Sequence, residues 1–383
     1  MERERANSAG EQRRRLPSLW GGLPVGRMLG VPIRLHLSWL VLFVFAFSML
    51  RRLFAAHAEP PAATQLALIT TLLLLFSALL HELGHAVMAR RLGIEVEAIT
   101  LFLTGGMTKM RSEAETPGHE LKIALAGPAA SLAIALASGG LALASGGAVR
   151  MLWLVLAGCN AIIAVFNLLP SFPLDGGRIL RALLWFLHDD MLRATHSAAW
   201  IGRLLGAGLM GLAVVVAISA DLGAGLVLGT IGWMMERAAV SSYLQTALHY
   251  ALTRISIGDI MLRTFRTVSP QLTLDIFVGQ YLLGQTEQGY PVVQSERLLG
   301  MVTVRNLRPF TYSQWSKMLV GDVMIPSSEL PVLRASDPAK AAFHELIARR
   351  FEQLPVTDGD QLLGVVRRRD LLAFVHQTIN QHS

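Results

Sequence analysis

The sequence predicts a multi-span α-helical membrane domain, with about six transmembrane helices, followed by a smaller α/β module. Three observations support this fold class. Residues 35 to 240 are apolar and rich in glycine and alanine, residues 253 to 378 have the composition of a soluble domain, and that second region repeats itself. Only 16% of the 383 residues are charged, whereas a soluble domain carries about 25%. Together with the mean hydropathy of +0.47, this indicates that lipid forms part of the solvent.

Six apolar stretches are long enough to cross a bilayer, which takes about 20 helical residues for ~30 Å of hydrocarbon. They cover residues 35–54, 64–89, 120–145, 149–170, 199–219 and 223–240, and the last two are separated by a short turn near Asp221. More of the lysines and arginines near the span ends lie on the same side of the membrane as the N-terminus, so the positive-inside rule predicts that this side is cytoplasmic. Since six is an even number of spans, the C-terminus is expected on the cytoplasmic side as well. The expected domains are a basic tail at 1–30, a membrane domain at 31–240, a linker at 241–252, and two repeat copies at 253–310 and 317–378.

The net charge of +7 does not require a nucleic-acid partner, and none is expected. Five arginines lie within the first fifteen residues, where they can set the orientation of the first span and contact anionic lipid headgroups. The single cysteine, Cys159, excludes an intrachain disulfide and a zinc site built from cysteines. It lies in an apolar run, and a small buried hydrophobe is the favoured interpretation.

The pentad HELGH, at the end of the second apolar stretch, is the strongest candidate for chemistry. His81 and His85 are four residues apart, so on a helix both imidazoles can reach one metal, and Glu82 is placed to take a proton from water. The alternative is a pair of core histidines hydrogen-bonded across helices. Ionisable side chains at membrane depth are costly unless they pair or bind something, and this favours a zinc site.

A catalytic zinc needs a third protein ligand, and Asp175 in the segment NLLPSFPLDGGR is the candidate. Pro170 and Pro173 are expected to break the helix there and let the chain turn a carboxylate inward. The alternative is that Asp175 caps a helix that begins near Gly177. The presence of HELGH favours the ligand role.

These motifs resemble the site-2 protease family of intramembrane zinc metalloproteases. The resemblance covers residues 30–240 and includes HELGH, NLLPSFPLDGG, the pair Gly105-Gly106 and the segment AGPAAS at 126–131. It implies one Zn²⁺ per chain, bound by His81, His85 and Asp175, with Glu82 as the general base. The resemblance also matches Asn167 to a residue that hydrogen-bonds substrate or the oxyanion; an interhelical hydrogen bond is an equal alternative.

The segment from Glu95 to Met110 first alternates between polar and apolar residues and then becomes apolar, and it is too short for a helical span. This pattern predicts a β-hairpin around Gly105 and Gly106. Since a substrate helix must unwind before its carbonyls can be attacked, this hairpin is expected to bind the unwound segment by strand addition. His36 lies at the mouth of the first stretch, where an interfacial hydrogen bond is favoured over a role at the zinc or a gate.

The C-terminal region contains a repeat with an offset of 63 to 64 residues. IGDIM at 257–261 returns as VGDVM at 320–324, and LLGMVTVRNL at 298–307 returns as LLGVVRRRDL at 362–371. Each copy predicts the order strand, helix, strand, strand, helix. The pattern resembles a tandem CBS-domain module, a type that often binds adenine nucleotides.

The ligand signature of that family is a small hydroxyl residue followed three positions later by aspartate, and each copy departs from it once. The first copy has Thr303 but Asn306, and the second has Asp370 but Arg367. Two interpretations stay open: adenine nucleotide binding at Thr303, Asn306 and Asp370, and a ligand-free module that docks or forms a homodimer.

Three functions from different classes are consistent with these features. The first is an intramembrane protease that cleaves membrane-spanning protein substrates in regulated proteolysis and is controlled by its CBS module. The second is a CBS-regulated metal transporter, and the third is a catalytically silent membrane scaffold. A transporter should offer coordinating groups at several depths. The ionisable groups here gather at one depth beside a general base, which favours the protease.

Overall fold

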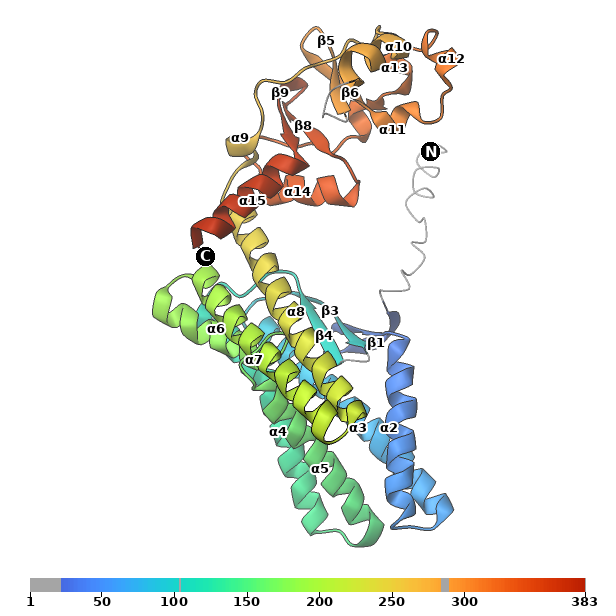
Figure 1. Ribbon diagram of the computed structural model, residues 1–383, viewed down its shortest axis with the longest axis vertical. Coiled ribbons are helices and arrows are strands. Elements are labelled where there is room, and N and C mark those ends of the chain that lie inside the picture. Colours follow the sequence, from blue (N-terminus) through green and yellow to red (C-terminus); the bar gives the residue numbers. More distant parts are fainter. Residues whose placement is uncertain (1–21, 103–104, 284–288, 383) are drawn as a thin grey trace. The chain divides into compact units, whose positions relative to one another are not determined.

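A computed structural model describes residues 22–102, 105–283 and 289–382, and it divides the chain into two compact units, Met1–Ser242 and Tyr243–Ser383 (Figure 1). Each unit is described on its own. The five N-terminal arginines and most of the expected tail at 1–30 lie outside the described residues.

The first unit is dominated by long helices. They are α2 (Ser38–Ala55), α3 (Pro60–Arg91), α4 (Pro117–Leu143), α5 (Gly147–Asn167), α6 (Asp175–His188), α7 (Met191–Ser219) and α8 (Leu222–Thr253), of which the residues from Tyr243 on belong to the second unit. Among the described residues, α2, α3, α4, α5 and α7 are long and apolar enough to cross a membrane. The sixth expected stretch, 223–240, lies within α8, which does not reach that apolarity, so the structure supports five spans and leaves the count of six unconfirmed.

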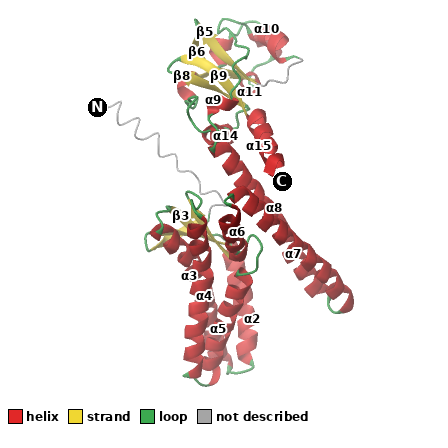
Figure 2. Cartoon of the chain, turned by 90° about the vertical axis from the view of Figure 1, so that its left-hand side faces the viewer, coloured by secondary structure: helices red, strands yellow, loops and turns green. Residues whose placement is uncertain are grey.

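The first four long helices, α2 to α5, run lengthwise beside one another (Figure 2). Their outward faces are apolar: Val41, Phe45, Leu136 and Ile162 are each more than half exposed, as expected of surfaces that meet lipid. Glycines allow α7 and α8 to pack closely against each other. A Cβ on Gly206 of α7 would lie 2.7 Å from the carbonyl oxygen of Gly232 on α8, so this pair depends on the absence of side chains.

A four-stranded sheet lies against α3 in this unit. Its order is β1-β2-β3-β4, formed by Leu23–Met28, Val31–Leu35, Val96–Phe102 and Gly105–Met110. Strands β3 and β4 pair antiparallel, which confirms the expected hairpin, and its tip at 103–104 lies outside the described residues. Ile99 and Leu101 of β3 pack with Leu83 of α3 and Ile123 of α4 in one buried cluster. The sheet is therefore fixed to the helix that carries HELGH.

The second unit contains the two repeat copies. Its sheet has the order β5-β6-β9-β8, formed by Gly289–Gln294, Arg297–Thr303, Gln361–Arg367 and Gln353–Asp358, and β7 (Ile325–Pro326) pairs with β6. The helices are α9 (Ile257–Ile260), α10 (Leu274–Phe277), α11 (Val304–Leu307), α12 (Tyr312–Trp315), α13 (Val320–Val323), α14 (Ala339–Ala348) and α15 (Arg368–His382), with a π-turn at Val278–Leu282 and a 3₁₀ turn at Ser327–Glu329.

The repeat is exact in register. Gly289 pairs with Thr303 in the first copy, as Gln353 pairs with Arg367 in the second, and both hairpins have an irregularity at the same position. The leading strand expected in each copy is not formed as a full strand: the first copy has a single bridge between Val268 and Val292, and the second has a hydrogen bond from the N–H of Thr357 to the carbonyl oxygen of Leu333. Two apolar clusters lie in this unit, and each contains residues of both copies: Ile257 and Met261 pack with Leu354 and Val356, whereas Val320 and Val323 pack with Tyr290 and Val292.

Candidate metal centre

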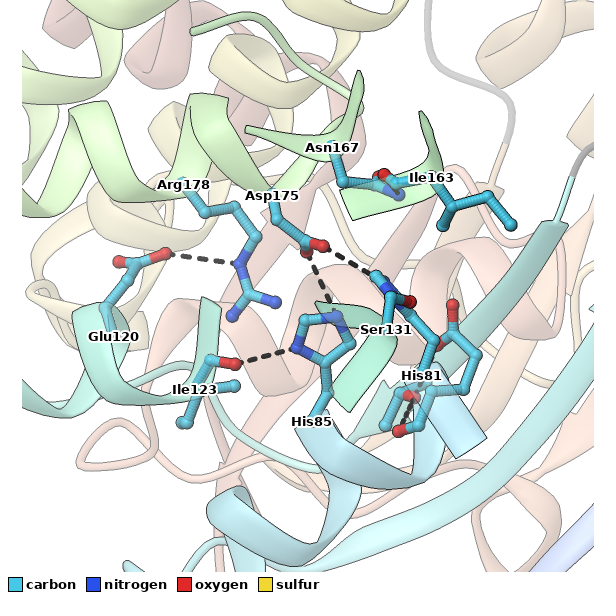
Figure 3. A network of polar contacts seen from close by, with 11 residues as sticks. His81, His85, Glu120, Ile123, Ser131, Ile163, Asn167, Asp175 and Arg178 are labelled. Carbon is cyan, nitrogen blue, oxygen red and sulfur yellow. Dashed lines mark hydrogen bonds and ion pairs between the residues drawn. The ribbon is translucent and has the colours of Figure 1, made fainter. Parts of the chain in front are cut away.

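The two histidines of HELGH lie side by side on α3, one helical turn apart. Their rings meet edge to face with centroids 5.0 Å apart, and only 6% of His81 and 4% of His85 is exposed. The four-residue spacing on a regular helix is what brings them together, as the sequence predicts. Both rings point toward the start of α6 (Figure 3).

The Nδ1 atoms of the two rings are occupied by partners on α4. Nδ1 of His85 donates to the carbonyl oxygen of Ile123 at 2.7 Å, and Nδ1 of His81 lies 2.9 Å from Oγ of Ser131. Such partners fix the orientation of a ligating imidazole and direct the lone pair of the other nitrogen to the metal. Nε2 is thereby the free coordinating atom of each ring.

Asp175 completes the group. Its Oδ2 lies 3.2 Å from Nε2 of His81, and its Oδ1 lies 3.2 Å from Nε2 of His85. It is the first residue of α6, and the residue before that helix, Leu174, makes no side-chain cap. The carboxylate therefore faces the histidines, and the capping alternative is not observed.

The three side chains fit one zinc ion. Their ligand atoms lie within 4.8 Å of one another, and no second group of this kind occurs in the part of the chain that the structure describes. For bonds of about 2.0–2.1 Å, a tetrahedral ion holds its ligand atoms about 3.3 Å apart, close to the 3.2 Å seen here. Two histidines with one carboxylate is a donor set of catalytic rather than structural zinc sites.

Two glycines make room for this site. A Cβ on Gly127 of α4 would lie 2.5 Å from Cε1 of His85 and 2.7 Å from Nε2 of His81, so no larger residue fits there. A Cβ on Gly84 of α3 would lie 2.7 Å from the carbonyl oxygen of Ala126. The glycine within HELGH and the glycine of AGPAAS thus let α3 and α4 approach around the ligands.

Glu82 projects toward the β-hairpin. The Oγ1 hydroxyl of Thr108 on β4 donates to Oε2 of Glu82 at 2.7 Å and also lies 3.2 Å from its backbone oxygen. A Cβ on Gly106 would lie 2.6 Å from Cδ of Glu82. Gly106, expected at the substrate site, is therefore in contact with the expected base. A Cβ on Gly105 would meet no atom within 4 Å.

Among the described residues, no hydrogen bond joins Asn167 or His36 to the metal group. Nδ2 of Asn167 donates to the carbonyl oxygen of Ile163 on its own helix at 2.9 Å, so the interhelical bond considered for it is not observed (Figure 3). His36 hydrogen-bonds Oγ of Ser38 at 2.8 Å and contacts the ring of Phe102, as the interfacial interpretation expects.

Sequence reasoning missed four residues around the site: Thr108, Gly127, Ser131 and Glu120. Gly127 and Ser131 belong to AGPAAS, and that motif was the signal that could have identified them. Nothing in the local sequence pairs Thr108 with Glu82 or Glu120 with its partners, because those contacts join separate elements.

In the second unit, the structure brings together only part of the predicted nucleotide site. Oγ1 of Thr303 donates to Oδ1 of Asn306 at 2.6 Å, and both line a cavity of about 400 Å³. Asp370 does not line it and is instead ion-paired with Arg367 at 2.6 Å. The cavity is rich in cationic side chains: Arg305, Arg308, Arg349 and Arg350.

Comparisons with known proteins identify the families to which the two parts of the chain are similar. The sequence model of peptidase family M50 matches residues 69–147 and 139–209, and that of the CBS domain matches residues 320–377. A Mycobacterium tuberculosis protein named as the zinc metalloprotease Rip3 is 34% identical over 365 residues, which cover 92% of each chain. The zinc metalloprotease MJ0392 of Methanocaldococcus jannaschii is 27% identical, over 90% of this chain and 94% of the relative. The solved site-2 protease of Methanocaldococcus jannaschii is 27% identical over 58% of this chain and 94% of its own, with a TM-score of 0.40.

Proposed function

The chain belongs to peptidase family M50, the zinc metalloproteases of the site-2 protease type, and we propose that it hydrolyses peptide bonds of membrane-spanning protein substrates under the control of its CBS module. Membership follows from the 34% identity to Rip3 along nearly the whole chain. The observation that carries the proposal is the buried group of His81, His85 and Asp175, with Glu82 next to His81 on α3.

In this proposal, His81, His85 and Asp175 hold one Zn²⁺ per chain. Zinc held there polarises the scissile carbonyl and lowers the pKa of water to about 7. The protein's part is to keep two neutral imidazoles and a carboxylate aimed at one point. The bonds from Ile123 and Ser131 to the Nδ1 atoms support that role.

Glu82 is the proposed general base. Its carboxylate accepts the proton of the attacking water and then passes it to the leaving amine. The hydroxyl of Thr108 holds one carboxylate oxygen at 2.7 Å, which leaves Oε1 as the oxygen that receives the proton. Asn167 is kept as a proposed contact to substrate or oxyanion, for which its amide would have to leave the carbonyl of Ile163.

Substrate is proposed to pair as an extended strand with β4, near Gly105 and Gly106. In the described sheet, β4 is an edge strand, and it carries both the contact to Glu82 and the open side at Gly105.

A proline substitution at Gly105 is a poor test of this pairing, since the φ of +131° there excludes proline. Thr104 lies outside the described residues. The sharper test is a proline scan of the substrate. Strand pairing uses the N–H groups of alternate residues, and proline has no N–H group. The rate of cleavage should therefore decrease when proline occupies every second position of the paired substrate segment. Uniform tolerance of proline would contradict the pairing.

The CBS module is proposed to bind an adenine nucleotide at the cavity beside Thr303 and Asn306. Arginines that line this cavity suit a phosphate chain, which they can bind through paired hydrogen bonds. Asp370, engaged by Arg367, would have to release that partner to take part. Titration calorimetry of the purified full-length chain with ATP, ADP and AMP tests this. The absence of heat with all three would favour a module that docks or joins two chains, which sedimentation would then reveal.

Orientation is a further part of the proposal. Both termini are placed in the cytoplasm, in contact with membrane lipid at the basic leader. Reporter fusions at each terminus and after α2 test it: activity of a cytoplasmic reporter at both termini is expected, and opposite sides for the two ends would refute it.

The decisive experiment for the function is co-expression with candidate membrane-spanning substrates, comparing the wild type with Glu82→Gln. The amide keeps the shape of the side chain but cannot accept the proton, so cleavage should be lost while zinc stays bound. Cleavage by the Glu82→Gln variant would refute the mechanism.

A further inference from the structure

A buried cluster of charges joins α4 to α6 beside the metal centre. Glu120, in the first turn of α4, is fully buried, and its Oε1 accepts hydrogen bonds from Nε and Nη2 of Arg181, the former at 3.1 Å. Nε of Arg178 lies 3.5 Å from the same oxygen. Only 8% of Arg181 is exposed. Both arginines belong to α6, the helix that begins with Asp175.

Each partner of this cluster lies close along its helix to a group that forms the metal centre. On α4, Ile123 is three residues after Glu120, and its carbonyl oxygen holds His85. On α6, Arg178 is three residues after Asp175, so the two share one face of the helix. Figure 3 shows Glu120 and Arg178 next to Asp175, His85 and Ile123.

Arg181 also reaches the segment that leads into Asp175. Its guanidinium lies 5.8 Å from the ring centroid of Phe172, which is itself buried. The same side chain is thus bound to α4 through Glu120 and to the loop before α6 through Phe172. The loop and the helix on either side of Asp175 are held to α4 by one cation.

Stability alone does not explain this arrangement. A buried ion pair often stabilises a fold no better than apolar side chains of similar volume, because both charges lose their water. Oε2 of Glu120 is buried and has no hydrogen-bond partner among the described residues, which adds a further cost. A cluster that costs this much free energy and holds α4 and α6 in one relative orientation is suited to positioning the residues that these helices carry.

We propose that Glu120 is a positioning residue: through Arg178 and Arg181 it fixes α6 on α4 and so places the carboxylate of Asp175 against His81 and His85. This inference rests on the proposed zinc site. Asp175 is the one ligand that does not come from α3, and its position therefore depends on how α6 is held. Loss of the cluster should leave both histidines in place and misdirect only the third ligand.

The test is zinc affinity of the purified, metal-free, full-length protein, measured by competition with a fluorescent chelator. Glu120→Gln is expected to bind zinc 10- to 100-fold more weakly than the wild type, the range seen when an outer partner of a ligand is removed. Glu236→Gln is the matched control, since Glu236 pairs with Arg203 at 3.6 Å on α7 and α8. The control should bind zinc like the wild type.

A second variant separates positioning from folding. In Glu120→Leu/Arg181→Met, apolar side chains replace the pair, which usually preserves stability. If the metal-free double variant unfolds at the wild-type temperature but binds zinc at least 10-fold more weakly, the positioning role is supported. If either folded variant binds zinc with wild-type affinity, the inference is overturned. Failure of the wild type itself to bind zinc would instead overturn the proposed function.

Discussion

Replacing Gly127 with alanine should dismantle the metal centre while leaving α4 intact. The added Cβ would lie 2.7 Å from Nε2 of His81, and ordinary contact begins at 3.4 Å, so that nitrogen must move by about 0.7 Å (3.4 minus 2.7). Zinc sites tolerate about 0.2 Å in ligand distance. His85 is displaced further, since its Nε2 is the atom nearest to the same Cβ and its Cε1 would lie only 2.5 Å away. Misplacement of reacting groups by about 1 Å can cost 10²-fold, which sets the expected loss in cleavage and a similar loss in zinc affinity.

The assay is zinc competition followed by cleavage of a membrane-spanning substrate by the same preparation. Gly139→Ala is the control, because residue 139 lies on the same helix and a Cβ there meets no atom within 4 Å. The control should match the wild type or gain slight stability, since alanine favours a helix by about 1 kcal/mol over glycine. Wild-type zinc affinity in Gly127→Ala would refute the reasoning, because it would mean that the histidines do not occupy the space the structure assigns to them.

Three other predictions concern the same centre. Thr108→Val, which lacks the hydroxyl that orients Glu82, should lower kcat about tenfold without changing zinc affinity, whereas Thr108→Ser should recover most of the rate; equal rates in both variants would contradict the contact. Ser131→Ala removes the partner of Nδ1 of His81 and should weaken zinc binding 10- to 100-fold, which chelator competition measures. Zinc at 100 times its Kd should add about 2.7 kcal/mol to the free energy of unfolding of the membrane unit. Removal of zinc by a chelator should therefore lower the Tm, and addition of zinc should restore it. An unchanged Tm would argue against a bound ion.

The proposed ligand set was accessible from the sequence because its geometry is encoded locally. The HELGH spacing fixes two ligands on one helix, and the prolines and glycines around Asp175 indicate where a buried helix must restart. Thr108 and Glu120 were not accessible, because their contacts join elements that only the fold brings together. The number of spans was uncertain for a related reason: 223–240 is apolar, yet it lies within α8, a helix that extends to Thr253 and mixes polar residues with the apolar ones.

The second unit shows the same division between local and tertiary information. The repeat predicted two equivalent hairpins, and their registers agree at an offset of 64 residues, from Gly289 and Thr303 to Gln353 and Arg367. The sequence shows that the two copies carry different residues at these positions, but not which of those residues line a cavity. Thr303 and Asn306 line a cavity, whereas Asp370 does not line it and is ion-paired with Arg367.

The separation of the ligands along the chain has a consequence for biosynthesis. His81 and Asp175 are 94 positions apart, and four described helices, α2 to α5, are synthesised before the carboxylate of Asp175. A nascent chain that has inserted only HELGH holds two histidines and a base but lacks the third ligand. With Asp175 as the proposed third ligand, the zinc site is complete only after α6 has been synthesised and has packed on α4.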